Sequence, residues 1–282
     1  MNNPSQSEVD SIARVAIKIR KDILRMVRSG GAGHIGGAFS CVDIMASLYF
    51  SVLRIDPENP GWPERDRLIL SAGHKCMALY GALRQRGFFE ESLLDTYGAL
   101  GSRLPGHPAM QKLPGIEANT GALGHGLSIA GGMAMGLKLQ KSPAKVYVIM
   151  GDGELAEGSN WEAAAAAAHH KLDNLLVFVD RNGFQLSDKT TKVMNYEPLA
   201  EKWAAFGWSV REIDGHDIRA IVGNAKATPF VAEKPSVLIA DTIKAKGLSF
   251  GEGKVDFHYW KPKYEELLKA EAELSELEKE LT

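Results

Sequence analysis

Two stretches decide the fold: Val146-Tyr-Val-Ile-Met-Gly151-Asp152-Gly153-Glu154-Leu-Ala-Glu157-Gly158 and Leu175-Leu-Val-Phe-Val-Asp180-Arg-Asn182. Each begins with a short apolar run, and an alanine-rich segment of helical length separates them, a pattern typical of a parallel β-α-β unit. Asp152 follows the first predicted strand, and Asn182 follows the second. Ligands of open α/β sheets bind at the carboxyl ends of strands, so Asp152 and Asn182 are predicted to face one crevice.

The first stretch also fits a dinucleotide-binding fingerprint, in the form Gly151-x-Gly153-x-x-Ala156. That fingerprint offers bare backbone N–H groups to a pyrophosphate, whereas here Asp152 lies between the two glycines. A carboxylate so close to a diphosphate would repel it unless a cation lay between them. Because Asp, Asn and diphosphate oxygens are ligands suited to Mg²⁺, the pattern favours a metal-bridged diphosphate site over a dinucleotide site.

Composition and charge restrict the class of protein. The chain has 282 residues, 45% hydrophobic and 24% charged, enough for one large α/β domain with or without a small appendage. A net charge of −2 gives no reason to expect nucleic acid or a membrane surface as partner. Cys41 and Cys76 lack metal-ligand spacing and suit a reducing compartment. With no secretory leader or membrane-spanning run apparent, a cytoplasmic protein is expected.

Alternating apolar runs and helical segments extend the central unit into an α/β fold with a parallel sheet. Further strands are predicted at 66–71, 208–213 and 236–240. An amphipathic helix is predicted at 7–28, and other helices at 41–53, 74–86, 127–139, 198–206 and 217–227. The domain is expected to span 1–260. Residues 261–282 are predicted to form a charged helical tail, solvated or docked on a partner.

Several histidines lie in loops at predicted strand or helix ends. His34 lies in a segment where five of the eight residues 30–37 are glycine, a density not expected in regular structure but suited to a ligand-binding loop, with a flexible linker as the alternative. His74 follows the strand at 66–71, His107 lies between prolines in 104–108, and His258 lies in the long loop 241–260. Zinc-ligand spacing is absent. Neutral imidazoles around one crevice suit proton transfer and hydrogen bonding to a polyhydroxylated substrate. His216, in Asp214-Gly-His-Asp217, reads mainly as part of a turn.

Taken together, these segments resemble transketolase. Gly151-Asp152-Gly153, followed after 28 residues by Asn182, resembles the thiamine diphosphate motif. Other landmarks of that family are matched in the same order by Ser29-Gly-Gly-Ala-Gly33-His34-x-Gly36, Ser71-Ala-Gly73-His74, Pro105-Gly106-His107-Pro108 and Thr120-Gly121-x-Leu123-Gly124. The resemblance implies a single thiamine diphosphate-binding domain of the diphosphate-binding (PP) type, with a parallel sheet flanked by helices on both faces.

The resemblance also implies roles for individual residues. A metal ion, Mg²⁺ or Ca²⁺, would be held by Asp152, the Asn182 side chain and the Phe184 backbone carbonyl. Thiamine diphosphate would be contacted by His74, Gly121, Ala122, Leu123, Gly153, Asn182, Lys244 and His258. The residues expected to act in catalysis are His34 and His107, which would bind sugar hydroxyls, His258, which would reach cofactor and substrate, and Glu157, which would communicate across a dimer interface.

The match ends where the first domain of transketolase ends, and so implies the N-terminal subunit of a split transketolase. With a C-terminal subunit carrying the pyrimidine-binding and C-terminal domains, it would transfer a two-carbon ketol unit from a ketose phosphate to an aldose phosphate, as in the pentose phosphate pathway. A heterotetramer of two such chains and two partners is expected. The chain alone is expected to be inactive.

Three positions depart from the family pattern. Gly37 replaces a common serine or alanine, His125 replaces a usual glutamine, and Tyr259-Trp260 follows His258 where the family typically has glycine next. Two aromatic residues in the substrate mouth would suit a branched or modified ketose phosphate. Two other classes remain open: the α-chain of a 2-oxoacid dehydrogenase, which shares the glycine-aspartate-glycine motif, and a non-catalytic interaction module.

Overall fold

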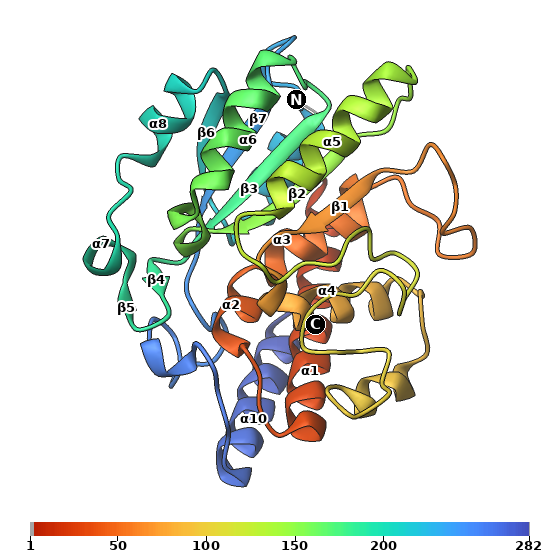
Figure 1. The fold of residues 1–282 in the computed structure, drawn as a ribbon. Helices are drawn as coiled ribbons and strands as arrows, with labels where there is room; N and C mark the ends of the chain where they lie inside the picture. The colour runs from red at the N-terminus through yellow and green to blue at the C-terminus, as the bar shows by residue number, and fades with distance from the viewer. Residues whose placement is uncertain (1–2, 282) are drawn as a thin grey trace.

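A computed structural model describes residues 3–281 of the chain. Its centre is a five-stranded sheet in which all neighbouring strands are parallel, in the order β1-β2-β3-β7-β6 (Figure 1). The strands are β1 Arg67–Leu70, β2 Val146–Gly151, β3 Leu175–Arg181, β6 Ser209–Asp214 and β7 Ser236–Asp241, with a separate hairpin of β4 Phe184–Gln185 and β5 Asp188–Lys189. The predicted β-α-β unit is therefore confirmed, since β2 and β3 pair directly in parallel.

Helices cover both faces of this sheet (Figure 1). They are α1 Gln6–Gly30, α2 Ile35–Ser40, α3 Val42–Ser47, α4 Cys76–Gln85, α5 Gly126–Leu139, α6 Gly158–His169, α7 Thr190–Val193, α8 Leu199–Ala205, α9 Ile218–Lys226 and α10 Tyr264–Glu280. Short 3-10 turns lie at Gly73–Lys75, Glu91–Thr96, Gly153–Ala156 and Val255–Phe257. Within the described part of the chain, no helix combines the length and apolarity needed to cross a bilayer.

Two hydrophobic clusters pack against the sheet, one on each face. Successive strand residues point to opposite faces, so in β2 Tyr147 and Ile149 enter one cluster while Val148 and Met150 enter the other. The first cluster contains side chains from α1, α2, α3, α4, α9 and α10, and the second contains side chains from α5, α6 and α8. The expected α/β fold with helices on both faces is confirmed.

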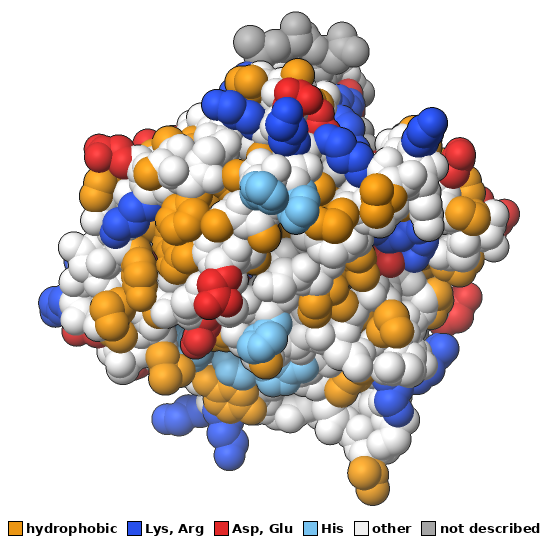
Figure 2. Space-filling view, turned by 45° about the horizontal axis from the view of Figure 1, so that its top comes forward, with side chains coloured by type: hydrophobic (Ala, Val, Ile, Leu, Met, Phe, Trp, Pro, Cys, Tyr) orange, Lys and Arg blue, Asp and Glu red, His pale blue; other side chains and the backbone are white. Residues whose placement is uncertain are grey.

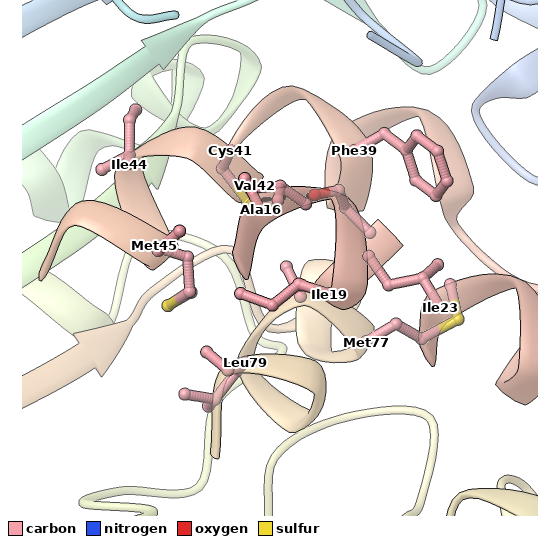
Figure 3. Close-up of a cluster of buried hydrophobic side chains, with 14 of the residues drawn as sticks. Ala16, Ile19, Ile23, Phe39, Cys41, Val42, Ile44, Met45, Met77 and Leu79 are labelled. Carbon is pink, nitrogen blue, oxygen red and sulfur yellow. Dashed lines mark hydrogen bonds between the residues drawn. The ribbon is translucent and has the colours of Figure 1, made fainter. Parts of the chain in front are cut away.

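The long helix α1 organises the first cluster. It begins after Ser5, whose hydroxyl accepts a hydrogen bond from the Glu8 N–H at 3.2 Å, and ends at Gly31, whose φ of 75° lies in the left-handed region. The predicted amphipathic character is confirmed, because its apolar stripe, which includes Ile19 and Ile23, is buried against α2, α3 and α4 (Figure 3).

The glycine-rich segment is more regular than predicted. Gly36 and Gly37 lie in α2, and the predicted helix at 41–53 is divided into α3 and a π-helical turn at Leu48–Val52. A Cβ atom on Gly36 would lie 2.5 Å from the Phe257 carbonyl oxygen, and the Gly36 carbonyl accepts a hydrogen bond from the Ala245 N–H at 2.9 Å. Gly36 is therefore required for close packing of a helix against the loop after β7, rather than for an irregular backbone.

The C-terminal helix α10 packs on its own chain. Leu267, Ala270 and Leu274, spaced along one helical face, are buried in the same cluster as α1. Ion pairs from Arg28 to Glu271 and from Lys21 to Glu278 join the two helices at their edges. The prediction of a solvated helix is therefore wrong, because these apolar residues form a face of α10 that packs on the hydrophobic core. The boundary between residues 260 and 261 stays a prediction.

This packing predicts a difference between two leucines of α10. Leu274 is fully buried, whereas Leu277 is 37% exposed. Leu274→Ala is expected to lower the free energy of unfolding by about 2–4 kcal/mol through lost burial and a residual cavity, and Leu277→Ala by less than about 1 kcal/mol. Urea unfolding of the isolated chain measures both. Equal, small effects would show that α10 does not dock on α1.

Candidate functional site

The loops at the carboxyl ends of β1, β2, β3 and β7 border one cavity of about 310 Å³. Residues from α2 and from the loop before α5 complete its wall. It is lined by His34, Gly37, His74, Lys75, Gly121, Leu123, Gly151, Asp152, Gly153, Glu154, Asn182, Phe184, Gln185, Leu186, Lys244 and His258. Asp152 and Asn182 thus share one crevice, as the strand pattern predicts.

Three of the predicted site residues do not line this cavity. Ala122, Glu157 and His107 are exposed side chains outside it. His107 is nevertheless close, with its ring centre 6.4 Å from that of His34. Gly121 has a φ of 142°, and a Cβ atom there would lie 2.6 Å from Cδ2 of His107. Glycine at 121 therefore leaves room for His107 at the cavity rim.

Asp152 and Asn182 present oxygen atoms on adjacent strand ends. Asp152 Oδ1 accepts a hydrogen bond from the Gly153 N–H at 2.9 Å, and Oδ2 accepts one from the Gly183 N–H at 2.7 Å. Asn182 Oδ1 accepts one from the Phe184 N–H at 3.2 Å. Burial and the nearby Asp180 raise the pKa of Asp152 to about 6, although the Lys75 ammonium opposes this. A bound cation would stabilise the charged form of Asp152.

The donor chemistry of this edge fits a divalent cation and a diphosphate. A carboxylate, an amide oxygen and a backbone carbonyl are hard ligands of the kind that Mg²⁺ and Ca²⁺ take, and each hydrogen-bonded oxygen keeps acceptor capacity. Across residues 3–281, no group of three or more His, Cys, Asp and Glu side chains is placed to hold a metal. A metal here would therefore depend on the amide and carbonyl oxygens. In addition, Gln185 lines the cavity with a buried Oε1 that has no hydrogen-bond partner among the described residues.

A buried ion pair lies beneath the cavity and has no local signature in the sequence. Lys75 is 2% exposed, and its Nζ lies 2.5 Å from Oδ2 of Asp180 at the end of β3. Ser40 donates to the same carboxylate at 2.6 Å, and the Thr242 hydroxyl also donates to it. Burial lowers the pKa of Lys75, but the charge of Asp180, its hydrogen bond and the nearby Cys41 and Asp152 together raise it above its ordinary value, so the ammonium stays charged. A Cβ on Gly37 would lie 3.1 Å from Cε of Lys75, so glycine at this position makes room for the lysine.

Glu154 also has a role that its position in the sequence does not reveal. Its buried carboxylate accepts hydrogen bonds from the Ser71 hydroxyl, from the Gly124 N–H at 2.9 Å and from the Gly151 N–H at 3.2 Å. Burial raises the pKa of Glu154, while these hydrogen bonds oppose the rise. Glu154 therefore joins the ends of β1 and β2 to the loop before α5, and its oxygens are already occupied.

Three other imidazoles gather around His34, those of His74, His107 and His258. The ring centre of His34 lies 5.3 Å from that of His74 and 5.4 Å from that of His258. Burial, with the nearby His107 and Lys244, lowers the pKa of His34 to about 4, and burial together with Lys244 lowers the pKa of His258 to about 4. Both rings are therefore neutral at pH 7. Histidine side chains also reach the surface in the lower centre of Figure 2.

Most of these ring nitrogens have no hydrogen-bond partner in the part of the chain that the structure describes. Within the described residues, the side chains of His34, His74 and His107 make no hydrogen bond. His258 Nδ1 accepts a hydrogen bond from Nζ of Lys244 at 3.3 Å, which leaves the proton on Nε2. Burial, followed by repulsion from Lys75, lowers the pKa of Lys244 to about 8. The cluster can therefore exchange hydrogen bonds with a ligand rich in hydroxyl groups.

His216 is structural and supports the position of Lys244. Its Nε2 accepts a hydrogen bond from the Ile243 N–H at 2.9 Å, so Nδ1 carries the proton and donates to Asp43 at 2.7 Å. The interpretation of His216 as part of a turn is thus confirmed and extended, because the residue ties the loop after β7 to α3.

The residues that depart from the family pattern at 125, 259 and 260 lie in different parts of the structure. Trp260 is buried, stacks on Phe257 with ring centres 5.4 Å apart, and pairs with Gly33 in an antiparallel bridge. The prediction that Trp260 lies in the substrate mouth is wrong, because its apolar indole packs in the hydrophobic core. Tyr259 is 57% exposed and lies beside His34. His125 is exposed, with Nδ1 3.1 Å from the Leu123 carbonyl oxygen, and does not line the cavity.

Fold and cavity together define an α/β domain that offers oxygen ligands and buried ammonium groups at one sheet edge. Residues 12–274 match the family described as "Transketolase, thiamine diphosphate binding domain". The chain is 45% identical over 276 residues to the 6-deoxy-6-sulfo-D-fructose transketolase subunit SqwG of a Clostridium species, covering 98% of this chain and 99% of that one. It is 43% identical over 277 residues to one of the subunits of apulose-4-phosphate transketolase from Phocaeicola vulgatus, covering 97% and 98%.

Longer relatives match through part of their length. Transketolase of Homo sapiens is 34% identical over 258 residues, which cover 91% of this chain and 41% of that protein. The solved transketolase of Campylobacter jejuni superposes with a TM-score of 0.86 at 31% identity, covering 96% of this chain and 43% of that chain. The chain belongs to the transketolase family, a family of transferases, and its fold is the thiamine diphosphate-binding domain of that family. A dinucleotide site and a 2-oxoacid dehydrogenase α-chain are thereby set aside.

The buried ion pair predicts strong coupling between its partners. Lys75→Met or Asp180→Asn alone leaves one partner buried without its counterpart and is expected to lower the free energy of unfolding by about 3–5 kcal/mol. The double variant removes both groups and is expected to be more stable than either single variant. Lys279→Met, at an exposed pair with Glu276, is the control and should change stability by less than about 1 kcal/mol. Additive single effects, measured by urea unfolding, would contradict the pairing.

The histidine cluster predicts a pH dependence of stability. The pKa of His258 is about 4 in the folded chain against an ordinary 6.5, so below pH 6.5 the unfolded chain binds the proton more strongly. The contribution of His258 to stability is therefore constant above pH 6.5 and decreases as the pH falls toward 4. The measurement is the difference in unfolding free energy between the native chain and His258→Gln from pH 8 to pH 5. A difference independent of pH would show that His258 is not desolvated.

Proposed function

We propose that this chain is the diphosphate-binding subunit of a split transketolase that transfers a two-carbon ketol unit from a ketose donor to an aldose acceptor. It acts with a second chain that carries the pyrimidine-binding and C-terminal domains, in a heterotetramer of two copies of each. The observation that carries the proposal is the cavity itself, in which the oxygen ligands of Asp152 and Asn182 face two buried lysines and a cluster of neutral histidines.

The relatives support the need for a partner. Two of them are named as subunits, and this chain aligns with 98–99% of their length, whereas it aligns with 41% of human transketolase. The exposed Ala122 and Glu157, predicted to contact cofactor and dimer interface, fit the same proposal, because a second chain would complete the wall on their side.

Each part of the cavity has a task in this proposal. Asp152, the Asn182 side chain and the Phe184 carbonyl hold Mg²⁺, and Gly153, His74 and Lys244 contact the diphosphate. Thiamine diphosphate, when bound, supplies the electron sink for cleavage of the ketose C2–C3 bond. His34, His107 and His258 bind the sugar hydroxyls, and their neutral rings accept the proton released from a hydroxyl as that bond breaks.

The donor is proposed to be a branched or otherwise modified ketose phosphate, or a sulfonated analogue. The relatives named for such sugars, apulose 4-phosphate and 6-deoxy-6-sulfo-D-fructose, are 43–45% identical to the chain, against 34% for human transketolase. Tyr259, next to His34, adds an aromatic side chain where the resemblance leads one to expect glycine.

The proposal predicts a metal-dependent cofactor site in the assembled enzyme. The chain is mixed with its partner, and thiamine diphosphate affinity is measured by calorimetry with Mg²⁺ and with EDTA, alongside ketol transfer to an aldose phosphate. Asp152→Ala is expected to weaken Mg²⁺-dependent binding at least about 100-fold, since a charged metal ligand is lost. His258→Ala is expected to lower turnover about 100-fold with little change in cofactor affinity.

Two results would contradict the proposal. Unchanged cofactor affinity in Asp152→Ala would remove the metal assignment. Full ketol transfer by this chain without its partner would overturn the split arrangement.

A further inference from the structure

Tyr259 is a large side chain at the rim of the cavity whose role the proposed function leaves unassigned. It is 57% exposed, and its ring centre lies 4.8 Å from that of His34 at an interplanar angle of 71°. It is not among the residues that line the cofactor cavity, whereas His34 is. Tyr259 therefore stands on the outer side of His34, between the histidine cluster and solvent.

The backbone around Tyr259 is fixed on both sides. Phe257 and Trp260 are buried and stacked, and two backbone hydrogen bonds join Trp260 and Gly33, with N···O distances of 2.9 Å and 3.0 Å. His258, between them, is held by Lys244. Since its neighbours are anchored, Tyr259 is presented at a defined place on the rim.

The packing of the described residues does not require a tyrosine at this position. Its ring is mostly exposed, so burial contributes little to stability. Within the described residues, its hydroxyl makes no hydrogen bond, although a phenol can both donate and accept one. Tyr259 therefore presents an aromatic ring and an unpaired hydroxyl beside His34, which is proposed to bind sugar hydroxyls. The two side chains can contact the same ligand.

We propose that Tyr259 is a specificity-determining residue that contacts the ketose donor beside His34. This inference rests on the proposed function. The cofactor cavity holds the reacting end of the donor, so a residue outside His34 meets the carbons beyond the transferred two-carbon unit. At this position the bulk of the Tyr259 ring excludes ketoses that carry some substituents. Its hydroxyl forms a hydrogen bond with a polar substituent of the ketose that is used as substrate.

The test compares Tyr259→Ala and Tyr259→Phe in the chain assembled with its partner. Tyr264→Ala is the matched control, because Tyr264 is 67% exposed on α10 and, among the described residues, makes no ring contact with a histidine, unlike Tyr259. KM and kcat are measured for D-fructose 6-phosphate, its 6-deoxy-6-sulfo analogue and apulose 4-phosphate. Thiamine diphosphate affinity and the size of the assembly are measured in parallel.

Tyr259→Ala is expected to change the ratio of kcat/KM between modified and unmodified donors at least about tenfold, mainly through KM, as for other pockets that lose one contact. Tyr259→Phe should give part of this change if the hydroxyl contributes, and cofactor affinity should stay within about twofold. Tyr264→Ala should leave the ratio unaltered.

Ratios unchanged in both Tyr259 variants would overturn the inference. So would a smaller assembly in those variants, which would make Tyr259 an interface residue. Absence of ketol transfer from any donor by the native complex would instead overturn the proposed function.

Discussion

The buried Lys75–Asp180 ion pair is the interaction on which the rest of the site depends. A parallel sheet sends the ends of its strands to one edge, and here that edge carries the carboxylates of Asp152, Glu154 and Asp180. Carboxylates so close to one another and so deeply buried would repel an anionic ligand. Lys75 neutralises Asp180, and three hydrogen bonds occupy Glu154, whereas Asp152, with one backbone hydrogen bond on each oxygen, keeps acceptor capacity that suits a cation.

The same edge separates two kinds of chemistry. Oxygen ligands and lysines lie at the floor, where a metal and a diphosphate are compatible with their charges. Neutral histidines lie toward the rim, where their low pKa values keep ring nitrogens available to hydroxyl groups. His216 and the bridge between Gly33 and Trp260 hold the loop after β7, so Lys244, His258 and Tyr259 approach from one direction. The oxygen ligands and the histidines are separated because the loops that carry them leave the sheet at different places.

Local patterns predict those parts of the site that depend on strand ends. Apolar runs followed by Asp152 and Asn182 are sufficient to place both residues at one edge, and the glycine-histidine loops indicate which side chains join them. The contacts of Lys75 and Glu154 join segments far apart in the sequence and have no local signature. Trp260 follows two site residues yet enters the core, because a bridge with Gly33 sets which way its side chain points. Gly36 and Gly37 lie in a helix where tertiary packing leaves little room for a Cβ atom, which explains glycine at these positions without an irregular backbone.

The proposed function requires a divalent cation that joins the end of β2, the end of β3 and a diphosphate. A crystal structure of the chain with its partner, thiamine diphosphate and Mg²⁺ tests this requirement. Mg²⁺ is then expected at about 2.1 Å from oxygens of the Asp152 carboxylate, the Asn182 amide, the Phe184 carbonyl and the diphosphate. A diphosphate bound in this cavity through backbone N–H groups and lysines alone, with no metal on Asp152, would contradict it.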